Sequence, residues 1–298
     1  MRRTRALIAS VAAASCLAAT PSIAHAQAWL PEKGSSSYSF DYTSVLNKKH
    51  YTPTGAEVDV GHTSIEILSI GGSYSPSDRV QISASLPYVN SRYIGPGGGG
   101  HDTEQDNGQW HGTVTDLQLT VHYQVTDGPI AWAPYIGFVI PTTDYETFGH
   151  SAAGRELEEY WLGFYAAASL NEWIPRTYVQ ILGNYAFVEK VRDIAHDRSN
   201  ASLEIGHFLN DAWSLRALVT RQWTHGGIDV PVPLTSPLFP DHDRLAAEEL
   251  LNVGAGVSWS LNERMSLYGL YLQSIEGTNA HKVHHRVSLG VSYGGSAH

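Results

Sequence analysis

DLQLTVHYQV, residues 116–125, alternates between apolar and polar side chains without interruption. Leu117, Leu119 and Val121 share one parity, and the residues between them are polar. Successive side chains of a β-strand point to opposite sides, so this segment predicts a strand with one apolar and one polar face. Such an apolar face packs either on a protein core or on lipid, and the rest of the chain distinguishes the two.

Alternating segments of this kind recur along the chain, and most are about as long as the roughly 9–11 residues that a tilted strand needs to cross a bilayer. We identify twelve: 34–42, 62–74, 79–89, 113–125, 132–140, 157–170, 177–187, 199–208, 213–223, 250–261, 265–273 and 284–293. In 64–74 the apolar parity changes near Ile67 and Leu68, which predicts a β-bulge. In 265–273 both parities carry large side chains, so the register of that strand stays open.

The connections between these segments alternate in length. Five are short turns rich in Asn, Asp, Pro and Ser, at 75–78, 126–129, 171–175, 209–212 and 261–264. Six longer loops lie between them, at 43–61, 90–112, 141–156, 188–198, 224–249 and 274–283. One rim of short turns and one rim of long loops is typical of an outer-membrane barrel, and an even strand number places both chain ends at the short-turn rim.

Aromatic side chains gather at both ends of the predicted strands. They are Tyr74, Tyr123, Trp132, Trp173, Trp213, Trp259 and Tyr293 at the short-turn end, and Tyr42, Tyr88, Tyr160, Trp161, Tyr185, Phe187 and Trp223 at the long-loop end. Two such belts suit two membrane–water interfaces. We therefore predict an all-β fold, a 12-stranded antiparallel transmembrane β-barrel of the outer-membrane type. A soluble β-sandwich or a closed periplasmic barrel would alternate equally well, but would leave the belts and the loop asymmetry unexplained.

The beginning of the chain has the organisation of a secretory signal peptide. Three arginines precede an apolar stretch, and the small residues of AHA (24–26) suit cleavage after Ala26. A membrane anchor is the alternative, although the apolar stretch is short for one. Cys16 lies too early for a lipoprotein signal. We expect residues 1–26 to be the signal peptide and residues 27–298 to form a single β-barrel domain in the outer membrane of a Gram-negative cell.

The composition narrows the class further. The chain has a formal net charge of −10, which becomes −13 once the three arginines of the predicted signal peptide are removed. This acidity argues against a nucleic-acid partner. After the signal, no run of about 18 apolar residues predicts a transmembrane helix. Cys16 is the only cysteine, so we expect an exported chain without disulfides.

If the apolar parity meets lipid, the polar parity lines the lumen. We predict these pore-lining residues: Glu66, Gln81, Asp116, Gln118, His122, Tyr135, Tyr165, Gln180, Asn184, Glu204, Arg216, Gln222, Asn252 and Arg286. Twelve strands enclose a bore between those of filled eight-stranded barrels and wide porins, enough for one small molecule. Tyr135, Trp161 and Tyr165 favour a solute with an apolar or aromatic part. Alternatively, the acids and Arg216 or Arg286 only pair with one another inside a plugged barrel.

Three segments carry a resemblance to a known family. SDRVQISASLPYV (77–89), GTVTDLQLTVHYQV (112–125) and YIGFVIPTTDYETFG (135–149) are similar in order to the outer-membrane family named for the MetA pathway of phenol degradation. Two features depart from the family pattern, because Thr143 stands where a glycine is expected and Tyr293, the last aromatic residue, is not terminal. The resemblance implies an outer-membrane transporter or channel for small hydrophobic or aromatic compounds.

Other kinds of site have weaker support. HKVHH (281–285) could bind zinc or copper, but solvated loop histidines explain it better, and we expect no metal and no cofactor. His122 and Asp116 are of the right type for acid–base chemistry, but six positions along a strand separate them by about 20 Å. HDRLAAEELL (242–251) predicts a short helical turn in a loop.

The sequence thus predicts an outer-membrane channel for small hydrophobic or aromatic solutes that is not an enzyme. A barrel enzyme acting on lipids and a structural barrel that displays loops are the alternatives. The expected partners are outer-membrane lipids, a small-molecule solute and the barrel-assembly machinery during insertion, and we expect no nucleic acid. The oligomeric state stays open.

Overall fold

The computed structural model describes residues 28–95 and 104–295, so the predicted signal peptide lies outside the described residues. The strands are β1 (Ser36–Tyr51), β2 (Glu57–Ser77), β3 (Val80–Ile94), β4 (His111–Val114), β5 (Asp116–Tyr123), β6 (Thr126–Asp127), β7 (Ile130–Pro141), β8 (Glu159–Ser169), β9 (Thr177–Val188), β10 (His196–Phe208), β11 (Trp213–Gly226), β12 (Glu249–Ser260), β13 (Met265–Thr278) and β14 (Ala280–Gly295). The regular secondary structure of the described chain is therefore almost entirely β-strand.

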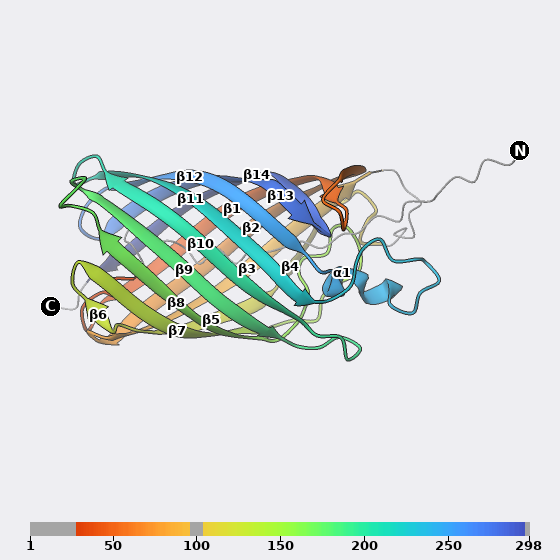
Figure 1. Cartoon of the computed structure of the whole chain (residues 1–298), viewed down its shortest axis with the longest axis horizontal. Helices are drawn as coiled ribbons and strands as arrows, with labels where there is room; N and C mark the ends of the chain where they lie inside the picture. Colours follow the sequence, from red (N-terminus) through yellow and green to blue (C-terminus); the bar gives the residue numbers. More distant parts are fainter. Residues whose placement is uncertain (1–27, 96–103, 296–298) are drawn as a thin grey trace, which may run out of the picture.

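The strands form one closed antiparallel barrel (Figure 1). β4 and β5 are two parts of one crossing, interrupted at Thr115, and β6 is a two-residue strand in a turn. The result is the predicted 12-stranded barrel. β1 closes the ring by pairing with β14 along its length, so the sheet of the described residues has no open side across the ring.

Helical structure among the described residues is confined to the loop before β12. A 3₁₀ turn (Phe239–Asp241) leads into the one-turn helix α1 (His242–Leu245), which confirms the helical turn predicted at the start of 242–251. No helix in the described part of the chain has the length and apolar character to span a membrane. In Figure 1, α1 lies at one end of the barrel and the short turns, with β6, lie at the other.

The strands at the loop rim extend farther than the alternation predicts. β1 continues to Tyr51 and β2 begins at Glu57, so most of the loop predicted at 43–61 is strand. The loop predicted at 274–283 is reduced to Asn279, between β13 and β14. In these parts the buried apolar side chains, such as Val45 and Val283, face inward, whereas the prediction depended on an apolar side that faces outward.

The change of parity in β2 has a different cause from the predicted bulge. The register of β2 with β1 and β3 runs without a shift through Ile67 and Leu68, so the bulge predicted there is wrong. Leu68 points outward and is 40% exposed, whereas Ile65 points inward and is 4% exposed. The parity changes because the inner side of the loop-rim half is itself apolar.

Strand pairing also assigns the register that the sequence leaves open in 265–273. β13 pairs with β12 and β14 so that Tyr268 and Leu272 face the interior, while Tyr271 is exposed on the outer wall. Both parities carry large side chains because one set fills the lumen and the other covers the outside.

The outer wall carries apolar side chains along the middle of the strands, as Leu203 and Ile205 of β10 illustrate. Exposed rings lie at both rims: Tyr74, Tyr123, Trp132, Trp213, Trp259 and Tyr293 toward the short turns, and Tyr88, Tyr160 and Phe187 toward the loops. An exposed apolar band between two aromatic belts suits a surface that contacts lipid. Trp161 faces the interior, so its assignment to a belt is wrong.

Candidate functional site

A cavity of about 200 Å³ lies inside the barrel, between inward-facing side chains of most of the strands. Its lining combines aromatic rings, arginines and carboxylates: Tyr135, Trp161, Tyr165, Tyr268, Arg155, Arg198, Arg216, Arg286, Asp41, Asp116 and Glu159. The centre of the barrel is therefore a polar chamber with aromatic walls.

One wall of the chamber is aromatic and belongs to β5, β7 and β8. The Tyr135 ring lies 5.0 Å from the ring of His122 and 5.5 Å from the ring of Tyr165. Asn184 of β9 donates a hydrogen bond from Nδ2 to the Tyr135 hydroxyl at 2.9 Å. Gly163 pairs with Tyr135, and a Cβ at Gly163 would come within 2.5 Å of the tyrosine ring. The missing side chain thus gives the ring room against the neighbouring strand.

Charged groups occupy the wall formed by β10, β11 and β13. Arg216 Nη1 lies 3.9 Å from Glu204 Oε2, and the guanidinium carbon lies 5.6 Å from the Tyr268 ring centroid. The Tyr268 hydroxyl donates to Asp41 Oδ1 at 2.5 Å, and the Tyr178 hydroxyl donates to Glu204 Oε1 at 2.7 Å. These partners lower the cost of holding charged groups away from bulk water.

A second charged group lies nearer the loop rim. Arg198 pairs with Glu159, whose Oε2 accepts a hydrogen bond from Trp161 Nε1 at 2.9 Å. Arg155 pairs with Glu248, and their side chains are 8% and 0% exposed. Because Arg155 follows β7 and Glu248 precedes β12, this buried pair joins two different loops.

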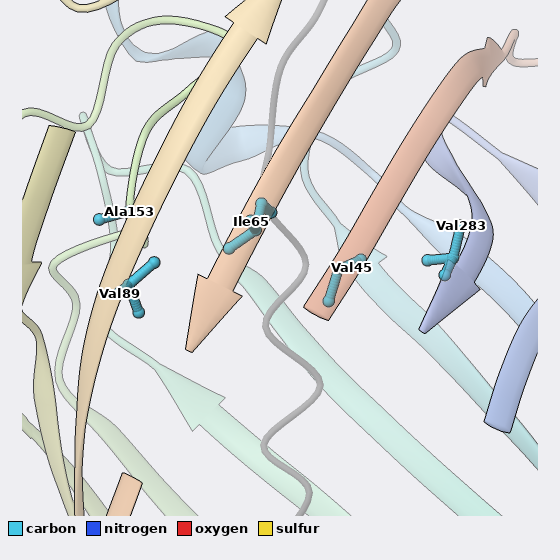
Figure 2. Close-up of a cluster of buried hydrophobic side chains, with 5 residues drawn as sticks. All are labelled: Val45, Ile65, Val89, Ala153 and Val283. Atoms are coloured by element: carbon cyan, nitrogen blue, oxygen red, sulfur yellow. The ribbon is translucent and has the colours of Figure 1, made fainter. Parts of the chain in front are cut away.

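The loop that joins β7 to β8 folds into the barrel. Its residue Ala153 packs with Val45, Ile65, Val89 and Val283, which come from four neighbouring strands (Figure 2). These inward apolar residues account for the change of parity in β2, because a strand that faces a packed loop needs an apolar inner side. The loop therefore narrows the lumen at the loop rim.

Hydrogen bonds hold this loop (142–158) to its surroundings. Thr63 Oγ1 of β2 donates to the His150 carbonyl at 2.9 Å. Asp106 accepts from the backbone N–H of His150 at 2.8 Å and of Ser151 at 2.9 Å. Burial alone would raise the pKa of Asp106, but the hydrogen bonds and charge of His150 and the Ser151 hydroxyl lower this pKa below its usual value. Asp106 therefore holds the loop as a carboxylate.

Residues before β1 narrow the opposite end of the lumen. The Ala28 N–H donates to Gln180 Oε1 at 3.1 Å, and the Leu30 N–H donates to Gln124 Oε1 at 2.6 Å. Gln124 Nε2 donates to the Ala28 carbonyl at 2.7 Å, and Ala28 is fully buried. The chamber is thus restricted at both ends.

Most of the predicted pore-lining residues face the interior. Those that line the central cavity are Asp116, Gln118, Tyr135, Tyr165, Asn184, Arg216, Gln222 and Arg286. Those that face the interior outside this cavity are Gln81, His122, Gln180, Glu204 and Asn252. Their role in conduction stays a prediction.

Glu66 does not face the interior, so its assignment to the lumen is wrong. It shares the parity of the exposed Leu68, and it pairs with Ser44. The hydroxyl of Tyr42, which also lies on the outer wall, donates to Glu66 Oε1 at 3.5 Å. The error follows from the predicted bulge, because a shift of one residue moves every later side chain to the other face.

Asp41 and Trp161 also line the cavity, and both belong to the polar parity that was predicted to face the lumen. Four further charged or aromatic lining residues were not predicted: Arg155, Glu159, Arg198 and Tyr268. Glu159 shares the parity of Tyr165 within a predicted segment, so parity alone could have found it. Arg198 lies one residue before a predicted segment. Tyr268 lies where the register was open, and Arg155 lies in a loop, which carries no parity signal.

We also looked among the described residues for a metal site and for the acid–base pair of His122 and Asp116. Among residues 28–95 and 104–295, no group of three His, Cys, Asp or Glu side chains forms a metal site. His122 contacts Thr120 Oγ1 at 3.0 Å, and Asp116 accepts a hydrogen bond from the Tyr145 hydroxyl at 2.7 Å. The two residues therefore have different partners and do not form an acid–base pair.

No protein-family model matches the chain, and no curated protein matches its sequence. Solved structures do match it. The chain is similar to the COG4313 outer membrane channel from Pseudomonas putida F1, with a TM-score of 0.71 and 15% identity over 92% of this chain and 100% of that chain. The fold is that of an outer-membrane β-barrel. The β domain of the Bordetella autotransporter BrkA is also similar, with a TM-score of 0.51 and 12% identity over 88% of this chain and 99% of that domain.

Proposed function

We propose that the chain is an outer-membrane channel for small solutes. The observation that carries the proposal is the chamber inside a closed barrel, lined by polar and aromatic side chains and surrounded by an apolar outer wall. The similarity in fold to the COG4313 channel supports it. In this proposal residues 1–26 direct export, the barrel-assembly machinery inserts the chain, and outer-membrane lipids surround it.

The proposed solutes are small compounds with an apolar or aromatic part. Tyr135, Trp161 and Tyr165 supply rings, and Leu182 and Leu270 add apolar surface to the same cavity. About 200 Å³ is less than the roughly 300–1,000 Å³ of a typical ligand pocket, so the chamber suits one compound the size of a single aromatic ring. The resemblance to the phenol-degradation family supports the same solute class.

Conductance and uptake measurements test this function. Purified protein in planar bilayers should form channels of small conductance, because loop 142–158 and residues 28–30 restrict the two ends of the lumen. Protein-loaded liposomes should take up a small aromatic compound faster than a sugar of similar size. Absence of both conductance and uptake, together with turnover of the lipid, would overturn the channel and favour a barrel enzyme.

A pair of tyrosine variants tests the solute class. Tyr135→Ala removes a ring from the chamber and should slow uptake of the aromatic compound more than uptake of the sugar. Tyr160→Ala removes an exposed ring from the outer wall of the neighbouring strand and is the matched control. Equal effects of the two variants on both solutes would refute a role for the aromatic wall in selection.

A further inference from the structure

The outer wall is unevenly charged at the loop rim. On the arc from β8 to β13, carboxylates face outward and engage neighbouring side chains. Asp197 accepts a hydrogen bond from the Tyr185 hydroxyl at 2.9 Å. Arg221 Nη2 lies 3.4 Å from Glu249 Oε2 and 3.9 Å from Glu276 Oε1. This arc is acidic, in keeping with the negative net charge of the chain.

Basic side chains gather on the arc that follows β13, formed by β14, β1, β2 and β3. Six of them make up what we name the basic rim patch: Lys48, His62, Arg92, Lys282, His284 and His285. Strand pairing aligns them in rows. One row consists of His285, Leu46, Ser64 and Arg92, and Lys48 and His62 form the next row toward the loops. Neighbouring strands lie about 4.8 Å apart, so the first row spans about 14 Å.

The side chains of the patch point away from the lumen. Ser91 and Tyr93, which flank Arg92, are buried inside the barrel, and so is Asn47 beside Lys48. Because side chains alternate along a strand, Arg92 and Lys48 face outward. The patch therefore lies on the outer wall, beyond the apolar band.

Positive charges in the patch lie close together. The ring centroids of His284 and His285 lie 5.5 Å apart. Desolvation, and then the nearby charges of Lys48, His285 and Lys282, lower the pKa of His284, so Lys48, Arg92 and Lys282 carry most of the positive charge of the patch.

Glu57 pairs with both Lys49 and Lys282 at the edge of the patch. Asp59 of β2 is exposed, and the outward-facing Glu66 lies two residues from Ser64, so three carboxylates offset part of the charge. The patch is thus a local concentration of positive charge on an acidic protein, a feature that attracts anionic headgroups.

The arginine of the patch is held in position. Its guanidinium carbon lies 4.8 Å from the ring centroid of Trp110, and this stacking fixes Arg92 without neutralising its charge. A fixed guanidinium is well suited to phosphate, because its N–H groups match the geometry of two phosphate oxygens.

We propose that the basic rim patch binds the phosphate groups of lipopolysaccharide, the phosphorylated lipid of the outer leaflet. The proposal rests on the outer-membrane location proposed above, which places the loop rim at the outer leaflet. Lipid A carries a phosphate at each end of its disaccharide, and His285 and Arg92, at the two ends of the first row, can contact one phosphate each. The acidic arc from β8 to β13 repels the same phosphates, so the lipid binds one side of the barrel.

Binding of lipid A to the folded protein in detergent, followed by native mass spectrometry, tests the proposal. The probes are bisphosphorylated lipid A, the same lipid without its phosphates, and inorganic phosphate. The bisphosphorylated lipid should bind, and its affinity should fall as salt is raised. Lys48→Ala combined with Arg92→Ala should weaken binding about thirtyfold, because each Lys or Arg near an anionic headgroup contributes roughly fivefold. The matched control combines Lys190→Ala with Arg192→Ala, which removes the same charges from the loop between β9 and β10.

Three outcomes would overturn the patch: equal binding of the phosphate-free lipid, equal weakening by the control pair, or full competition by inorganic phosphate. If Arg92→Ala impairs folding, Lys48→Ala with His285→Ala applies the same test at exposed or half-exposed positions. Conductance of the same preparations separates the two proposals. Lipid A binding without conductance would overturn the channel alone, and conductance without phosphate-dependent binding would overturn the patch alone.

Discussion

Breaking the ion pair between Arg155 and Glu248 should open the loop rim of the lumen. The pair joins loop 142–158 to the loop before β12, and its side chains are 8% and 0% exposed. Removing one partner of a buried ion pair costs about 3–5 kcal/mol, because the remaining charge has lost its compensation away from water. At about 1.4 kcal/mol per factor of ten, even the lower value shifts the ratio of docked to undocked loop by about 100-fold.

Single-channel recording in planar bilayers measures this change. Arg155→Ala should raise both the mean conductance and the time spent in the most conductive state. Arg155 also lines the cavity, so its removal could widen the pore directly. Glu248→Gln separates the two effects, because Glu248 is fully buried and weakening the same pair there leaves the cavity lining unchanged.

Arg192→Ala is the matched control for the loop pair. Arg192 pairs with Asp241 at the surface of the loops, where its side chain is 49% exposed. An exposed pair of this kind contributes about 0–1 kcal/mol, so the control should conduct like the unmodified protein. Unchanged conductance in folded Arg155→Ala and Glu248→Gln, or an equal increase in Arg192→Ala, would refute the role of the buried pair in closing the lumen.

Three further predictions concern the lumen, the loop and the barrel wall. Arg216→Ala should increase the preference of the channel for cations over anions, and Glu204→Ala should decrease it. Reversal potentials in a salt gradient measure this preference, and unchanged potentials would show that neither side chain lines the conduction path. The pKa of Asp106 is lowered in the folded protein, so its carboxylate stabilises loop 142–158 fully when the pH is above the unfolded-state pKa of about 4. This stabilisation is lost as the pH falls through the folded-state pKa. Protease cleavage within the loop should therefore increase in acid, and the Asp106→Asn variant should be cleaved readily at every pH. Cleavage that is unchanged both in acid and in Asp106→Asn would contradict the role of this carboxylate. Gly163→Ala should destabilise the barrel by about 1–3 kcal/mol through overpacking, whereas Gly269→Ala, whose nearest contact would be an ordinary 3.5 Å, should have little effect on heat-induced unfolding in gels.

The barrel itself could be predicted from the sequence because lipid imposes a strict pattern on every strand. Leu117 and Leu203 belong to alternating runs that the structure pairs in the expected order, and the short turns lie where Asn, Asp and Pro gather. The extra length of β1 and β13 could not be predicted in the same way. Above the apolar band the outer side no longer meets lipid and part of the inner side packs on a loop, so alternation with an apolar outer side no longer marks the strand.

The interior was less predictable because parity identifies a face but not what fills it. Ile65 and Val89 are apolar on the inner side, and nothing in their own segments indicates that Ala153 of a distant loop packs on them. The same contact led to a predicted bulge and to the misplacement of Glu66. The pairing of Arg155 with Glu248 is likewise a property of two loops, which approach each other only after the barrel has closed.

The most direct test of the account is the environment of two adjacent side chains on β10. Leu203 is exposed on the outer wall, whereas Glu204 faces the lumen and accepts a hydrogen bond from Tyr178. The chain beyond Cys16 contains no other cysteine, so Leu203→Cys and Glu204→Cys can each carry one spin label in a protein produced without residues 1–26. In liposomes the label at 203 should collide with oxygen dissolved in lipid, and the label at 204 should collide with a water-soluble reagent. Equal access of both labels to the water-soluble reagent would contradict a barrel whose outer wall meets lipid.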